Sequence, residues 1–241
     1  MTKWPKWNPA QANYNVDTVI ISDLHLGSAV SRVDALARAL TEFMFRRLIL
    51  LGDIFDDLDF NRLSESEWEF LGWVRKLTNR KRGKEVIWII GNHDKNIAGV
   101  FRHFVGLPVH REYTWKHHGR QYLATHGDQF DRFMINNPVI SELASGIYYY
   151  IQKYGGKSQK VSRWLKRQSK YWLHLHDKIA HDAAEHAHDR GAQVIFCGHT
   201  HLAMDNNNNS VRYVNAGCWT DNPSTLVSVG HHGEIKIHEF H

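Results

Sequence analysis

Long apolar runs are missing from this 241-residue sequence. No stretch approaches the roughly 20 consecutive apolar residues that a membrane-spanning helix requires, and the N-terminal segment lacks the apolar core of a secretory signal. Cysteine is also scarce: Cys197 and Cys218 are the only two, which excludes a disulfide framework and fits a reducing compartment. We therefore expect a cytoplasmic protein, with peripheral contact with the inner membrane as an alternative.

Acidic side chains are absent from residues 143–176, although the chain carries 25 of them in total. The same stretch interleaves lysine and arginine with tyrosine and tryptophan, inside a helix-like region that we place at residues 136–190. One interpretation is a solvated helical surface. The other is a lid insertion over an anionic, amphiphilic substrate. Under the second interpretation the candidate substrate-binding residues are Lys157, Lys160, Arg163, Trp164, Arg167 and Lys170.

Short apolar runs and helical patterns alternate in the first half of the chain. Strand-like runs occupy residues 17–23, 47–53 and 84–92, and helix-like patterns occupy residues 31–46 and 64–80. This alternation predicts a mainly parallel sheet with helices packed on it, which is an α/β fold. A hydrophobic content of 42% is enough to bury a full core.

Three later stretches are typical of hairpins, and they occupy residues 112–127, 201–217 and 224–240. The first would turn at His118-Gly119, and the second would turn through the asparagines at 206–209. We find no internal repeat and no linker between these parts. The sequence therefore predicts a single domain over residues 1–241, with the 136–190 helices inserted in it.

Side chains that can bind metal ions follow the strand-like runs. The candidates are Asp23, His25, Asp53, Asn92, His126, His199 and His201. Ligands of open α/β sheets gather beyond the carboxyl ends of the strands. Residues two apart in an extended chain point to the same side, so His199 and His201 can face one centre. Glycines allow a tight turn or a close approach of the backbone next to these positions, and they are Gly52, Gly91, Gly127 and Gly198.

The donor set contains nitrogen and oxygen but no thiolate, which favours manganese, iron or zinc over calcium. Seven ligands are too many for one ion, whereas two ions that share a bridging aspartate would use all of them. Two divalent ions, less two aspartates and a bridging hydroxide, leave about one positive charge for a phosphate. We therefore expect two divalent ions, with manganese preferred over iron or zinc, and attack of the bridging hydroxide on phosphorus.

The blocks "DLHLG", "GDIFD", "GNHD", "HGD" and "GHTH" resemble, in this order, the signature of the calcineurin-like metallophosphoesterase superfamily. The resemblance implies a four-layered α/β/β/α sandwich with two facing sheets. It also implies a ligand set for each ion: Asp23, His25, Asp53 and His201 for the first, and Asp53, Asn92, His126 and His199 for the second.

Two further roles follow from the same resemblance. His93 is expected to contact phosphate and to protonate the leaving oxygen, while Asp94 is expected to orient the His93 ring. Asp56 and Asp128 are interpreted as residues that support the ligands or the turns around them.

Block order, chain length and the helical insertion are most similar to the UDP-2,3-diacylglucosamine pyrophosphohydrolases, which implies a nucleotide-linked lipid as substrate and UMP and a lipid monophosphate as products. His93 stands where the characterised lipid A enzymes carry arginine, so a phosphodiesterase or phosphatase of soluble nucleotides or phosphoproteins stays open. A nucleic-acid substrate is disfavoured because the basic stretch is local. A non-catalytic metal-binding scaffold is the remaining alternative.

Overall fold

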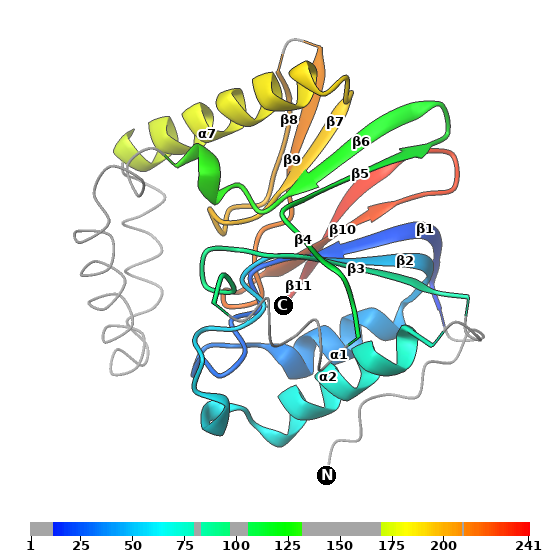
Figure 1. Cartoon of the computed structure of the whole chain (residues 1–241), viewed down its shortest axis with the longest axis vertical. Helices are drawn as coiled ribbons and strands as arrows, with labels where there is room; N and C mark the ends of the chain where they lie inside the picture. The colour runs from blue at the N-terminus through cyan, green and yellow to red at the C-terminus, as the bar shows by residue number, and fades with distance from the viewer. Residues whose placement is uncertain (1–11, 80–82, 97–105, 132–169, 209) are drawn as a thin grey trace.

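Two facing sheets form the centre of the molecule, and helices cover their outer faces (Figure 1). The computed structural model describes residues 12–79, 83–96, 106–131, 170–208 and 210–241. The layer order confirms the predicted α/β/β/α sandwich: α1 and α2 cover the first sheet, and α7 covers the second (Figure 1).

The first sheet has six strands in the order β11-β10-β1-β2-β3-β4. Its strands are β1 (Tyr14–Ile21), β2 (Phe43–Leu51), β3 (Glu85–Ile89), β4 (Val109–His110), β10 (Ser224–Val229) and β11 (Ile235–Phe240). The pairs from β1 to β4 are parallel, as the alternation of strands and helices predicts. The C-terminal hairpin of β10 and β11 adds to this sheet antiparallel to β1.

The second sheet has five strands in the order β5-β6-β7-β9-β8. Its strands are β5 (Glu112–His117), β6 (Arg120–Thr125), β7 (Val194–Cys197), β8 (Met204–Asn208) and β9 (Val211–Asn215). The predicted hairpins β5–β6 and β8–β9 are both present, and β7 pairs with β6 and β9 in parallel. His118 and Gly119 have φ of 48° and 76°, which is the backbone of the tight turn expected there.

The first two helices lie on the outer face of the first sheet. They are α1 (Val33–Thr41) and α2 (Glu65–Leu77), and a short helix, η2 (Phe60–Arg62), lies between β2 and α2. Ser64 and Glu67 close a capping box at the start of α2. The predicted helix at 31–46 was too long, because Phe43 and Phe45 alternate into the core and begin β2.

Helix α7 (Lys170–Asp189) changes the interpretation of the 136–190 region. Its apolar face packs on the second sheet through a row of buried residues, Ile179, Ala180, Ala183, Ala184 and Ala187. From Ile179 onward, the expected lid is therefore an outer layer of the fold. The preceding part of the predicted lid and five candidate substrate-binding residues lie outside the described residues, and the side chain of Lys170 is not described.

Three apolar clusters fill the spaces between the four layers. The central cluster lies between the two sheets and contains a stack of Trp115, Tyr122 and Phe196 with ring centroids 5.2 to 6.0 Å apart. Because both sheets are anchored to this core, the loops at their strand ends are held in fixed positions. In the described part of the chain, no helix has the length and apolar character needed to cross a membrane.

Candidate metal centre

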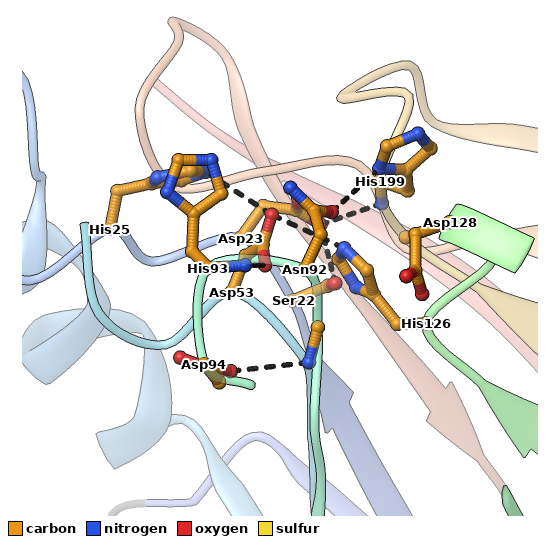
Figure 2. Close-up of polar contacts among 12 residues, drawn as sticks. Ser22, Asp23, His25, Asp53, Asn92, His93, Asp94, His126, Asp128 and His199 are labelled. Carbon is orange, nitrogen blue, oxygen red and sulfur yellow. Dashed lines mark hydrogen bonds and ion pairs between the residues drawn. The ribbon is translucent and has the colours of Figure 1, made fainter. Parts of the chain in front are cut away.

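All seven expected ligands meet at the edge of the sandwich where the parallel strands end, and Figure 2 labels all of them except His201. They come from loops that follow β1, β2, β3, β6 and β7. The arrangement joins residues more than 170 positions apart in the chain, since His25 Nε2 lies 3.3 Å from His201 Nε2. The strand-end residues selected from the sequence therefore lie together, and their role as ligands stays a prediction.

The candidate ligands divide into two groups. The first ligand group is Asp23, His25 and His201, and the second ligand group is Asp53, His126 and His199. In the first, His201 Nε2 lies 3.1 Å from Asp23 Oδ1. In the second, His126 Nε2 lies 3.2 Å from Asp53 Oδ2. The same Asp53 oxygen is 3.9 Å from His25 Nε2, so Asp53 lies between the two groups.

Five of these ligands have a left-handed backbone: φ is 53° at Asp23, 45° at His25, 50° at Asp53, 67° at His199 and 57° at His201. This conformation costs a non-glycine residue about 1–3 kcal/mol and concentrates at functional sites. The spacing of Asp-x-His and His-x-His suggested an extended chain at both places. The backbone is left-handed there instead. As a result His199 and His201 face different ligand groups.

Glycine is required where loops cross behind the ligands. A Cβ on Gly198 would collide with the Ser22 hydroxyl and the Asp23 carboxylate, and a Cβ on Gly91 would collide with Asp53. The close approach that glycine provides is thus used to bring the aspartates to the centre.

The residues fit a divalent cation. Asp23 Oδ1 and His126 Nε2 are buried and make no hydrogen bond within the described part of the chain. Each faces an oppositely charged group at close range, but outside hydrogen-bond geometry. Buried polar atoms without a hydrogen bond are rare in native proteins, and a cation bound by nitrogen and oxygen donors would satisfy both atoms.

The chain also matches a family model over residues 16–230, described as the calcineurin-like phosphoesterase superfamily domain. It belongs to the calcineurin-like phosphoesterase superfamily. The chain is accordingly a metal-dependent phosphoesterase, as the signature blocks predict.

The chain is also similar to several solved structures at low sequence identity. An archaeal phosphodiesterase is 11% identical with a TM-score of 0.50, covering 92% of this chain and 98% of its own. Zinc-bound Vps29 from Entamoeba histolytica is 14% identical with a TM-score of 0.46, covering 92% and 97%. Yfce, a phosphoesterase from E. coli, is 17% identical with a TM-score of 0.45, covering 88% and 87%. None of the curated proteins compared with the chain matches it.

Backbone and hydroxyl groups orient two of the histidines in this phosphoesterase. His126 Nδ1 donates to the Leu51 carbonyl at 2.9 Å, and His201 Nδ1 lies 3.4 Å from the Thr220 hydroxyl. Both contacts use the far nitrogen of the ring, which leaves Nε2 directed at the aspartates. Contacts of this kind fix the tautomer and the ring orientation of a metal-binding histidine.

Asp56 orients two further histidines. Its carboxylate lies 3.4 Å from His25 Nδ1 and accepts a hydrogen bond from Arg62 at 2.8 Å. Its backbone carbonyl accepts a hydrogen bond from His93 Nδ1 at 2.7 Å. The rings of His25 and His93 meet edge to face with centroids 4.8 Å apart. Asp56 therefore supports a ligand and places His93 beside the first ligand group.

Asp94 has a different role from the one that the resemblance implied. Its carboxylate accepts hydrogen bonds from the backbone of Ile54 and Phe55, each at 3.1 Å, and of Gly91 at 3.3 Å. The partner of the His93 ring is the Asp56 carbonyl rather than Asp94. Asp94 thus fastens the loop after β2 to the loop after β3. Burial and the nearby charge of Asp53 raise the pKa of Asp94 to about 6.

Charge pairing within the ligand groups is strong. Burial alone raises the pKa of Asp53, but the charge of His126 holds it well below its usual value. Burial alone lowers the pKa of His126, but Asp53 raises it to about 10. Asp23 likewise raises the pKa of His201 despite burial. Before any cation binds, protons on these histidines balance the aspartate charge.

Asp131 is a residue that the sequence analysis did not select. Its Oδ2 lies 3.2 Å from His199 Nε2, and the other ring nitrogen of His199 lies 3.1 Å from Asn92 Oδ1. The available signal was a second acidic residue three positions after Asp128 in "HGDQFD". Asp128 itself pairs with Lys95 at 2.7 Å.

Proposed function

We propose that this phosphoesterase hydrolyses phosphoester or pyrophosphate bonds with two divalent ions, one in each ligand group, and that Asp53 is shared between them. The supporting observation is the position of Asp53 Oδ2, 3.2 Å from a histidine of the second group and 3.9 Å from one of the first. Manganese is the ion we propose first, with iron or zinc as alternatives, since all donors are nitrogen or oxygen.

The side chains around the two ions have different roles. Asp23 and Asp53 supply the negative charge, and the histidine rings fix the positions of the neutral donors. When bound, two divalent ions supply a hydroxide at neutral pH and offset the charge on the phosphoryl oxygens. Asn92 completes the second group through Oδ1, which faces His199 Nδ1 at 3.1 Å.

His93 is proposed as the acid for the leaving oxygen. Its Nδ1 is held by the Asp56 carbonyl at 2.7 Å, so the other ring nitrogen can hold a proton for transfer. The ring contacts His25 of the first ligand group, which supports a position close to a bound phosphoryl group. A positioned acid of this kind contributes about 10²–10⁴-fold to a rate.

For the substrate we propose a nucleotide-linked lipid of the UDP-2,3-diacylglucosamine type, cleaved to UMP and a lipid monophosphate. The support is the order of the sequence blocks and the basic, aromatic composition of residues 143–169, which suits a diphosphate and acyl chains. A cytoplasmic location with peripheral membrane contact belongs to this proposal. Soluble nucleotides and a non-catalytic scaffold are the alternatives.

The test is manganese-dependent turnover of UDP-2,3-diacylglucosamine beside bis-p-nitrophenyl phosphate, with products identified by mass. Release of UMP and a lipid monophosphate, much faster than diester cleavage, supports the lipid substrate. Diester cleavage alone would indicate that the substrate is a soluble phosphodiester, and it would still agree with the two-ion proposal. A metal-loaded protein that cleaves neither would favour the scaffold.

A further inference from the structure

We propose that Asp131 is the positioning residue of the second ligand group, and that the affinity of this group for its ion depends on the Asp131 carboxylate. The geometry is direct: Asp131 Oδ2 lies 3.2 Å from His199 Nε2, and both side chains are only 8% exposed. The inference rests on the proposed function, because it assumes that an ion occupies the second ligand group.

The contact selects which nitrogen of His199 faces the ion. His199 has Asn92 Oδ1 beside Nδ1 and Asp131 Oδ2 beside Nε2. Both neighbours accept hydrogen bonds, but the Asp131 carboxylate is a stronger acceptor than the Asn92 amide oxygen. Nε2 therefore carries the proton when a cation takes the lone pair of Nδ1 in the second ligand group. A carboxylate in this position also makes the imidazole a stronger donor.

Asp131 is held in place by packing on the other side of the loop. It follows the short helix η4 (Asp128–Phe130), which starts from Gly127 with φ of 109°. Phe130 is buried in the cluster beneath α7. The centroid of its ring lies 5.1 Å from that of the His186 ring in α7. Because η4 is anchored in this core, the backbone at Asp131 is held in place. The Asp131 carboxylate therefore does not have to be ordered when the ion binds.

Asp128 gives a matched control because it lies in the same turn with the same chemistry. Its carboxylate pairs with Lys95 at 2.7 Å. Replacing it removes the same charge at nearly the same place in the sequence, but it leaves the contact between Asp131 and His199 intact. A general effect of charge on metal binding would appear in both variants, whereas positioning of His199 would appear only in the Asp131 variant.

The binding test is titration of the metal-free full chain with Mn2+, using calorimetry and bound-metal analysis, for wild type, Asp131→Asn, Asp131→Glu and Asp128→Asn. We expect Asp131→Asn to weaken one of two binding events by about 10–100-fold. Asp131→Glu should recover part of this loss, and Asp128→Asn should lose clearly less than Asp131→Asn, because the Asp128 carboxylate acts on His126 only through its charge. Equal affinities in Asp131→Asn and wild type, or equal losses in both asparagine variants, would overturn the proposal.

A second measurement on the wild-type chain does not depend on a variant folding. Nitrogen-15 NMR of histidine, in the metal-free and Zn2+-loaded protein, should show His199 protonated at Nε2, with Nδ1 shifted by the ion. A proton on Nδ1 in both states would overturn the role of Asp131. Wild-type protein that binds neither Mn2+ nor Zn2+ overturns the two-ion function together with this inference, whereas normal binding with an unaffected Asp131→Asn removes only the inference.

Discussion

The two ligand groups have similar donors but very different access to solvent. In the second group the side chains of His126 and Asp53 are 1% and 3% exposed. In the first group Asp23 is fully buried, but the His201 side chain is 27% exposed. One group is thus part of the interior of the sandwich, and the other opens toward solvent on its histidine side. We expect the substrate to approach from the first group, next to His93.

This difference follows from how the histidines are supported. In the second group, the Leu51 carbonyl accepts a hydrogen bond from His126, and the Asp131 carboxylate contacts His199 Nε2. In the first group the exposed histidine, His201, has a hydroxyl behind it at the longer distance of 3.4 Å. His25 of the first group also has a carboxylate, that of Asp56, beside its Nδ1, so the two groups differ in one histidine: His201 is held more weakly than His126.

The largest effect is expected where the two groups meet. Replacing Asp53 by asparagine removes the charge that both groups share, so both ions should be lost. Activity should fall by more than about 10⁴-fold, because the ions supply several kcal/mol of transition-state stabilisation. Metal analysis and turnover measure this, with Asp57→Asn as the control in the same loop. Retention of one full equivalent of metal would show that Asp53 serves a single group.

His93 lies beside the first group and tests whether that side carries the chemistry. His93→Gln should lower kcat by about 10²–10³-fold, since it removes a positioned proton donor, while bound metal stays at the wild-type level. His231→Gln, on the exposed β10–β11 hairpin, is the control and should be neutral. Loss of metal from His93→Gln would instead make His93 a ligand, in line with its clustering with His25 and Asp56.

The sequence was sufficient to predict the layers and which strand-end side chains lie together, because both rest on local patterns. Each ligand follows an apolar run, and parallel strands end at one edge. The division of the ligands was not predictable from spacing, since left-handed residues at His199 and His201 point them to different groups. The structural role of α7 was missed because its buried face is largely alanine, which gives a weak apolar signal beside many histidines.

Two carboxylate contacts could not be predicted from the sequence, because they depend on how the loops fold. Asp131 reaches His199 only because η4 turns the chain after Gly127, and Asp94 reaches the loop of Asp53 rather than the ring of its neighbour. A carboxylate near a motif can bind the backbone, a ligand or an ion, and its position in the sequence does not distinguish these partners.

The pH dependence of metal binding tests whether a histidine of each group carries a proton before the ion binds. His126 in the second group has a pKa raised to about 10, and the pKa of His201 in the first is also raised. Both are therefore protonated near neutral pH in the metal-free chain and must lose that proton to bind a cation. Affinity should rise with pH by about tenfold per unit for each displaced proton.

Calorimetry in buffers of different ionisation enthalpy, between about pH 6 and pH 8, would count the released protons. Burial lowers the pKa of His25, so this histidine should add no proton to the count. Binding with no proton release in either group would contradict the pairing of His126 and His201 with the aspartates.

The smallest expected effect concerns the hydroxyl behind His201. Thr220→Val keeps the shape of a side chain that is 6% exposed and removes its contact with His201 Nδ1. Loss of one neutral hydrogen bond costs about 0.5–1.5 kcal/mol, so the first group should bind its ion about 2–10-fold more weakly. Titration with Mn2+ measures this, and Thr114→Val on the exposed face of β5 is the control for the same chemical change. A loss as large as that expected for Asp131→Asn would mean that the two groups are equally dependent on their supporting contacts, and the contrast between His126 and the more weakly held His201 would then fail.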